Sequence, residues 1–427
     1  MKPVLPSQQS PGFLFLTIGI IICLTLLINV SFKIIVIQDM MFSVNSILCP
    51  LTAGIYLAIL RRSTIKEQRH LLNVALMTLY TFCIGIYISI NLPAAEYMHN
   101  NPVYQIIFDD IPKKFFAVTI SFALSFYLPH LLFCNKNNNI PASSEQSMLL
   151  ALTGGFSFFI LNFFLLFLGA HIHNFQQIML DSVMIASLLL LIIGVLYLAL
   201  LLKIIPNRAV PERNQEVFPL CYYLICFAMV IMLICLACEY RIIAFIGRNG
   251  ILAASALFFP ITLIIGTVIG ELWGYRINLK FCLFISATQF IFDSVLTGIV
   301  ALPSPEFFNL NPFYSYIMLR RLPADSLTLL ATFISNAMLL HYLRQHAIQR
   351  TYRVLIANIC ANSLLCLVDY SLLYGGIYPY EQIINLVVNV WQYKFIMTLL
   401  SLPLIIKVCS SLEKSKSLEL QCASVKP

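Results

Sequence analysis

The chain has 427 residues, of which 60% are hydrophobic and 10% charged, and its formal net charge is +8. Because soluble domains carry about 25% charged and about 45–50% apolar residues, this composition excludes an ordinary soluble fold and favours lipid as the solvent. The positive charges are spread over short segments between apolar runs, which argues against nucleic acid as a partner.

Apolar stretches of about twenty residues, long enough to cross a hydrocarbon core, follow one another along the chain. The first is too long for the apolar part of a signal peptide and lacks a clear cleavage site, so we expect a membrane span there. Pro50 and Pro260 fall inside spans, where neighbouring helices can satisfy the freed backbone groups. The sequence predicts an all-α polytopic membrane protein of about twelve spans, at 13–37, 43–60, 71–91, 114–134, 148–169, 178–202, 218–240, 251–272, 280–301, 324–343, 354–375 and 383–407.

The distribution of Lys and Arg indicates the orientation of these spans. When the N-terminus is placed in the cytoplasm, most of the basic residues fall in cytoplasmic segments, as the positive-inside rule requires. Both termini are therefore expected in the cytoplasm. Glu239 and Arg241 then lie at the outer surface, where we expect them to anchor a helix end.

A segment in the first half recurs in the second. Residues 92–104 and 302–314 share six of thirteen positions at a constant offset of 210, whereas chance would give about one. We therefore predict two parallel six-helix repeats, an arrangement found in many transporters. The expected parts are a first repeat at 1–202, a basic cytoplasmic linker at 203–217, a second repeat at 218–410 and a polar, disordered cytoplasmic tail at 411–427.

Sequence motifs of common enzymes are absent from the chain. It has no G-x-x-x-x-G-K-[ST] phosphate loop, no H-E-x-x-H zinc motif and no G-x-S-x-G nucleophile turn. Cys235 and Cys238 have C-x-x-C spacing, but they lie in a span without a partner pair, so we expect them to pack as small apolar residues. The sequence predicts no enzyme, no cofactor and no metal site.

Ionisable side chains inside spans are the candidates for function, because they are costly there unless they are paired or face a cavity. Most of them lie in the second repeat: Glu271, Asp293, His341, Asp369 and Lys394.

Each of these candidates also has a structural interpretation. Glu271 can reach water at a membrane face, Asp293 can form a hydrogen bond within the bundle, and His341 can sit at the interface. Asp369 and Lys394 can form an ion pair between two helices. The double G-x-x-x-G of Gly266, Gly270 and Gly274 is expected to let helices pack closely.

Several segments of the second half form a recognisable series. They are Phe259-Pro260-Ile261-Thr262, Glu271-Leu272-Trp273-Gly274, the proline-bearing loop from Leu302-Pro303 to Pro323, Ser335-Asn336, Asp369, and Trp391-x-x-Lys394 with Pro403 after it. Through these segments the second half resembles the queuosine-precursor transporter family, also called the vitamin uptake transporter family, and the first half resembles it less clearly. Departures are Thr267 and the region near Leu339, where the family often has an acid.

The resemblance implies a secondary transporter in the bacterial inner membrane that imports a queuosine precursor, such as a deazaguanine or queuine, or a related small heterocycle. The implied substrate-binding residues are Glu271, Asn336, Asp369, Trp391 and Lys394. In this interpretation Asp369 or Glu271 accepts two adjacent N–H groups, Trp391 stacks on the ring, and Lys394 pairs with an acid or contacts a carbonyl oxygen.

The expected partners are a small-molecule solute and the lipid bilayer, and the chain is expected to be a monomer because its two repeats would mimic a dimer. Two alternatives remain open at this point. One is a transporter of another small solute such as a vitamin, and the other is a structural or assembly membrane protein that transports nothing.

Overall fold

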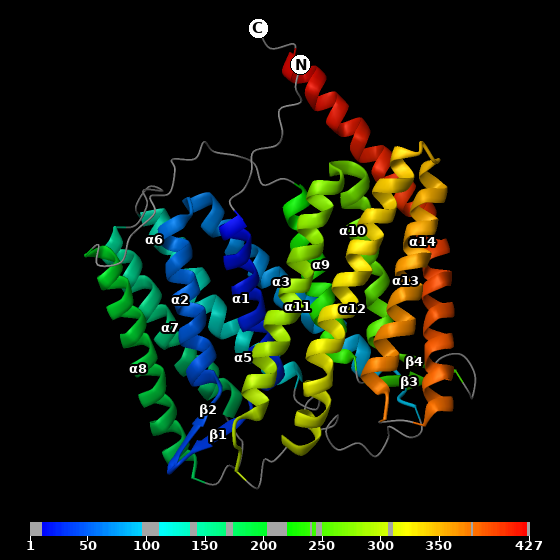
Figure 1. Ribbon diagram of the computed structural model, residues 1–427. Helices are drawn as coiled ribbons and strands as arrows, with labels where there is room; N and C mark the ends of the chain where they lie inside the picture. The colour runs from blue at the N-terminus through cyan, green and yellow to red at the C-terminus, as the bar shows by residue number, and fades with distance from the viewer. Residues whose placement is uncertain are drawn as a thin grey trace. The chain divides into compact units, whose positions relative to one another are not determined.

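The computed structural model describes residues 11–95, 111–136, 143–167, 174–202, 220–239, 241–244, 250–305, 311–376 and 379–424. These residues are almost entirely helical (Figure 1). Within them, eleven helices are long and apolar enough to cross a membrane. The predicted class, an all-α polytopic membrane protein, is therefore confirmed. The expected linker 203–217 lies outside the described residues.

Residues of the first half form α1 (Pro11–Val30), β1 (Ile34–Ile37), β2 (Met40–Ser43), α2 (Asn45–Arg62), α3 (Ile65–Asn91), α5 (Ile111–Phe122), the π-helical turn η2 (Ala123–Tyr127), α6 (Leu128–Lys136), α7 (Ser144–Phe167) and α8 (Phe175–Leu201). Those of the second half form α9 (Leu220–Cys238), β3 (Ile242–Ala244), β4 (Ile251–Ala253), α10 (Ser255–Trp273), α11 (Tyr275–Ala301), α12 (Asn311–Gln345), α13 (Arg350–Tyr374) and α14 (Tyr380–Ser424).

Two features differ from the sequence expectations. The expected span 43–60 is the helix α2, but it is not among the eleven membrane-length apolar helices, because Asn45, Arg61 and Arg62 make its ends polar. The second difference concerns the tail 411–427, which we expected to be disordered. The structure corrects this expectation, because α14 continues as a helix to Ser424.

Both halves begin with the same order of elements. A helix leads into an antiparallel two-stranded hairpin, and two further helices follow it. In the first hairpin Ile34 lies opposite Ser43, and in the second Ile242 lies opposite Ala253. The offset between these hairpins is close to the 210 residues that separate the repeated loop segments.

The chain forms two compact units, and each includes a short segment from the other half. Unit 1 comprises Met1–Tyr87, Pro102–Pro219 and Val295–Ser315; unit 2 comprises Ile88–Asn101, Leu220–Ser294 and Tyr316–Pro427. A cation holds the inserted segment in each unit. In unit 1 the Lys33 ammonium donates to the carbonyl oxygens of Val300 and Leu302, both at 2.8 Å. In unit 2 the Arg241 guanidinium donates to the carbonyl oxygens of Ile90 and Leu92.

Aromatic side chains fill the centre of unit 1. Phe158 lies edge to face with Phe122 and with Phe126, at ring-centroid distances of 6.0 and 5.5 Å, and all three are buried. The rings of Phe122 and Phe126 are tilted by 47° at 5.7 Å. Phe163 and Phe167 continue the cluster along α7. Such pairs favour offset or edge-to-face geometry and pack densely. These rings form an apolar cluster at the centre of unit 1.

Helices of unit 2 approach one another closely at small residues, as the G-x-x-x-G pattern predicts. A Cβ atom on Gly270 would lie 2.6 Å from the Asn278 amide nitrogen and 2.8 Å from a Leu340 methyl carbon, and one on Gly266 would lie 2.7 Å from the Phe281 ring. Gly274 ends α10 with a φ of +84°, a conformation that side chains disfavour, and α11 begins at the next residue. These glycines bring α10 against α11 and α12.

Candidate functional site

A small cavity in unit 2 brings together two of the five predicted site residues, Asp369 from α13 and Lys394 from α14. Its free volume is about 20 Å³, the space of roughly one water molecule. Its lining comes from α9, α10, α12, α13 and α14 and consists of Met232, Cys235, Leu236, Glu239, Ser255, Phe259, Leu329, Leu365, Asp369, Tyr370 and Lys394. A site with few polar groups among apolar and aromatic walls is typical of small-molecule binding.

Lys394 is buried, and its ammonium faces aromatic rings. The Nζ atom lies 4.6 Å from the centre of the Phe259 ring and 5.3 Å from that of Tyr370, both within the range of a cation–π interaction. Among the residues that the structure describes, no carboxylate forms an ion pair with Lys394. The direct Asp369–Lys394 pair, which the sequence left open as a structural interpretation, is therefore not formed, although both residues line the same cavity.

Asp369 accepts a hydrogen bond from the hydroxyl of Thr328, with 2.7 Å between the two oxygens. This bond fixes one carboxyl oxygen and orients the group between α12 and α13. The side chain is 4% exposed, so its charge is held away from bulk water. A buried carboxylate with one remaining acceptor edge can receive N–H donors from a bound solute.

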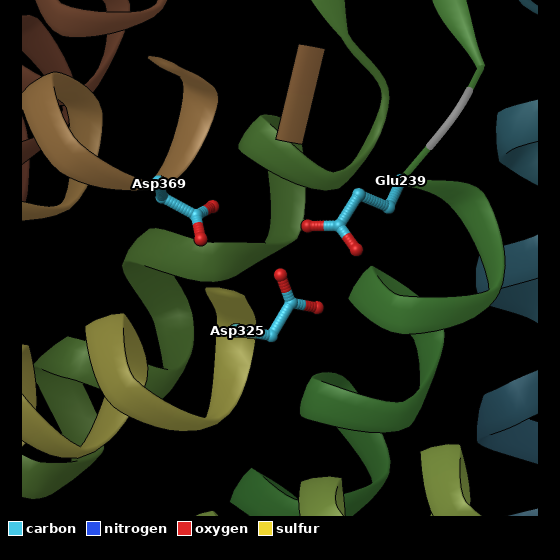
Figure 2. Close-up of side chains that lie close together, drawn as sticks. All are labelled: Glu239, Asp325 and Asp369. Carbon is cyan, nitrogen blue, oxygen red and sulfur yellow. The ribbon is translucent and has the colours of Figure 1, made fainter. Parts of the chain in front are cut away.

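Two further acids meet Asp369. Figure 2 shows the carboxyl groups of Glu239, Asp325 and Asp369 pointing toward one another from the end of α9, from α12 and from α13. One oxygen from each lies within 4.8 Å of the others, and all three residues are buried. Neither oxygen of Asp325 has a hydrogen-bond partner within the described part of the chain. We call these three residues the carboxyl cluster.

Arg321 provides positive charge beside the carboxyl cluster. Its guanidinium Nη2 lies 2.9 Å from Asp293 Oδ1 on α11, and its Nε lies 3.4 Å from Glu239 and 3.5 Å from Asp325. Asp293 also accepts a 2.7 Å hydrogen bond from the Gln289 amide. Four acids thus share one guanidinium and the Lys394 ammonium, which lines the cavity. The acids exceed the cations by two.

Glu239 corrects a sequence expectation. We expected an anchoring residue at the surface, but its side chain is buried and faces the carboxyl cluster. Burial raises the pKa of Glu239 to about 8, partly opposed by Arg321. The position of Glu239 is fixed through its backbone, since its carbonyl oxygen accepts a 2.8 Å hydrogen bond from the Tyr374 hydroxyl.

Glu271 lies in a separate ion-pair network and does not line the cavity. Arg353 holds it with two hydrogen bonds, one of them 2.7 Å from Nε to Oε1, and Arg350 Nε lies 3.3 Å from Oε2. Arg344 also donates to the backbone oxygen of Glu271 at 3.2 Å. The network ties the end of α10 to α12 and to the start of α13, so Glu271 has a clear structural role.

The remaining two predicted residues also lie outside the lining of the cavity. Asn336 donates to the Asn358 side-chain oxygen at 2.9 Å, and the hydroxyl of Thr267 donates to the same oxygen at 2.8 Å. This contact places a hydroxyl of α10 where the family resemblance suggested an acid. The Trp391 indole donates to Ser363 at 2.8 Å, and its ring stacks on Phe395.

Sequence reasoning missed the most concentrated polar feature of the site. Asp325 was not chosen as a candidate functional residue. It lies inside the expected span 324–343, where every ionisable residue is a candidate for function. Its spacing of four residues from Arg321 was a further signal, because positions i and i+4 lie on the same helix face. Asp293 was a candidate, but its partner Arg321 could not be found from sequence.

Comparison with protein families matches residues 253–408, which run from the end of β4 to α14, to the family described as "Putative vitamin uptake transporter". Residues 253–408 are thus similar to this family. The match includes Asp325, Asp369 and Lys394. Neither a comparison with curated proteins nor one with solved structures gave a significant match.

The family match agrees with the resemblance read from the sequence and indicates a membrane transporter for a vitamin-like small molecule. It covers most of unit 2, where the cavity lies.

Proposed function

We propose that this protein is a secondary transporter that imports a queuosine precursor, a deazaguanine or queuine, or a related small heterocycle. The observation that carries the proposal is the juxtaposition of Asp369, Lys394 and the rings of Phe259 and Tyr370 around one cavity, inside the segment that matches the transporter family.

The chemistry of these groups suits a flat heterocycle with both donors and acceptors. A deazaguanine presents adjacent N–H groups, and Asp369 can accept them in charge-assisted hydrogen bonds, which are about twice as strong as neutral ones. Lys394 can donate to the carbonyl oxygen of the same ring. Phe259 and Tyr370 offer aromatic faces for stacking. In this arrangement the solute would replace the ring contacts of Lys394.

The other predicted residues take supporting roles in the proposal. Glu271 would hold α10 against α13 through Arg353. Asn336 would fix α12 to α13 through Asn358, and Trp391 would fix α14 to α13 through Ser363. Direct contact with the solute is assigned to Asp369 and Lys394.

We further propose that the chain arose as a tandem duplication, in which the first half acts as a partner scaffold. The matching order of helix, hairpin and two helices supports this, as do the equivalent roles of Lys33 and Arg241. The cluster of buried phenylalanine rings in unit 1 supports a scaffold role for that unit, and the solute site is assigned to unit 2. The proposal includes a monomer, because two repeats would mimic a dimer, and a bacterial inner membrane, as the family resemblance implies. The distribution of Lys and Arg supports cytoplasmic positions for both termini.

The test is a rescue assay. Bacteria that cannot make queuosine precursors and lack their own importer receive the full chain and a trace of precursor, and queuosine in tRNA is measured. Restored queuosine in cells with this protein, and none with Asp369→Asn, is the expected result. No rescue, with the protein confirmed in the membrane, would reject the precursor and favour another vitamin-like solute or a role without transport.

A further inference from the structure

We propose that the carboxyl cluster is the proton site that couples transport to the proton gradient, with Glu239 and Asp325 carrying the proton and Asp369 linking it to the solute. The inference deepens the proposed function and rests on it for the identity of the solute. It assigns the proton as the coupling ion, which the family match does not specify.

The ion-pair partners of the four acids indicate which two of them carry the proton. Asp293 has a close partner in Arg321, at 2.9 Å. Asp369 has the Thr328 hydroxyl and shares its cavity with Lys394. Glu239 and Asp325 are left with only the longer contacts of 3.4 and 3.5 Å to the same, already paired, guanidinium.

Burial makes full ionisation of all four acids unfavourable. Glu239 and Asp325 are 8% and 1% exposed, and like charges placed this close cannot all persist away from water. The usual outcome is that one carboxyl of such a group keeps a proton. The raised pKa of Glu239, about 8, agrees with this.

Besides the proximity of the acids, two observations indicate a proton in the carboxyl cluster. Asp325 is buried and directed into the cluster with no donor to either oxygen among the described residues, so a proton on it or on a neighbour would complete the missing hydrogen bond. Lys394 is a buried ammonium on the same cavity without a carboxylate partner among those residues, and it favours an ionised Asp369. A metal cation is disfavoured because the guanidinium of Arg321 already lies beside Glu239 and Asp325.

Besides Arg321 and Asp293, other titratable groups near the cluster come from α9, α13 and α14, and none of these is a carboxylate. They are Cys235 and Cys238 from α9, Cys366, Tyr370 and Tyr374 from α13, and Lys394 from α14.

The coupling works through charge. A proton that binds Asp325 or Glu239 removes a negative charge next to Asp369. Asp369 then stays ionised at lower cost and accepts the N–H groups of the solute more strongly. Proton and solute therefore favour each other's binding, and linkage requires the effect to be reciprocal. When the site opens to the other side, the proton leaves the same oxygen for water. No covalent bond other than O–H forms or breaks.

The first arm of the test needs no solute. Infrared spectra of the purified full-length protein are recorded at neutral pH. Bands of protonated carboxyl groups are expected in the wild type and should be lost or reduced in Glu239→Gln and Asp325→Asn. Glu145→Gln, which changes an exposed acid at the start of α7, is the control and should leave the bands unchanged. Identical carboxyl bands in all four proteins would overturn the proposal.

The second arm uses proteoliposomes and radiolabelled queuine. An inward proton gradient should drive accumulation by the wild type and by Glu145→Gln. Asp325→Asn, which imitates the protonated acid, should lose about tenfold or more of this accumulation yet keep the exchange of labelled for unlabelled queuine. Accumulation that follows a sodium gradient instead, or survives in Asp325→Asn, would overturn proton coupling. Failure of the wild type to take up or exchange queuine would reject the proposed solute, and the infrared arm would still decide on the proton site.

Discussion

The guanidinium of Arg321 on α12 forms a buried ion pair with Asp293 on α11, at 2.9 Å between Nη2 and Oδ1. The same guanidinium lies beside Glu239 and Asp325, so a single cation joins three helices around the carboxyl cluster. Removal of one partner from a buried ion pair leaves an uncompensated charge, which costs much more than the pair contributes.

Arg321→Gln should therefore destabilise the protein by about 3–5 kcal/mol. Thermal unfolding of the purified protein in detergent measures this. The double variant Arg321→Gln with Asp293→Asn should recover part of the loss, because it removes the unpaired acid too. Arg276→Gln, which changes an exposed arginine of α11, is the matched control. An unfolding temperature equal to the wild type in Arg321→Gln would contradict the ion-pair assignment.

Asp369→Asn and Lys394→Ala should each abolish uptake while leaving membrane levels normal. Asn has one acceptor oxygen and no charge, so it cannot reproduce the two charge-assisted bonds to the solute, and Ala removes the cavity's ammonium. Uptake of labelled queuine and immunoblots of membranes are the measurements. Asp39→Asn and Lys280→Ala, both exposed, are the controls. Full uptake in both cavity variants would reject the solute site.

Glu271→Gln should weaken the contact of α10 with α13. The two hydrogen bonds from Arg353 become neutral-acceptor bonds at best, and the arginines lose their counter-charge, at a cost of about 1–3 kcal/mol. A cycle with Arg353→Gln, measured by thermal unfolding, should be less than additive. Glu381→Gln, an exposed acid at the start of α14, should be neutral. Additive losses would place Glu271 outside the network.

Glu239 should make stability depend on pH with a defined sign. Its pKa rises from 4.5 to about 8 on burial, so the folded state binds more protons than the unfolded state between these values. The stabilisation is complete below pH 4.5 and is lost as the pH rises toward about 8. Thermal unfolding across this window should show a steeper decline for the wild type than for Glu239→Gln. Equal slopes in the two proteins would show that Glu239 is ionised throughout.

Gly270→Ala should destabilise the protein by about 1–3 kcal/mol, since its new methyl group would lie 2.6 Å from the Asn278 amide and 2.8 Å from Leu340. Gly298→Ala is the matched control: it also changes a helical glycine, but no atom lies within 4 Å of the added Cβ. The control should be neutral or slightly stabilising, because Ala is the better helix former. The measurement is the unfolding temperature of each variant. Equal changes in Gly270→Ala and Gly298→Ala would contradict the close packing at Gly270.

The sequence predicted the membrane class because apolar segments of spanning length are a local property. It also predicted Asp369 and Lys394 as candidates, since charge inside a span is conspicuous. It could not show that Arg321 reaches Asp293, or that Glu239 turns inward, because both depend on how α9, α11 and α12 pack. Glu271 looked equally functional from its position in a span, but its partner Arg353 lies 82 residues later in the chain.

The segment Val295–Ser315 completes unit 1, although it is encoded in the second half of the chain. During synthesis, unit 1 therefore cannot reach its final structure until the ribosome has passed residue 315, and Lys33 waits for the carbonyl groups of Val300 and Leu302. A gene split between the halves would yield two fragments that must exchange segments to mature. Unit 2 in turn needs Ile88–Asn101 from the first half, so neither half of the chain can complete its unit alone.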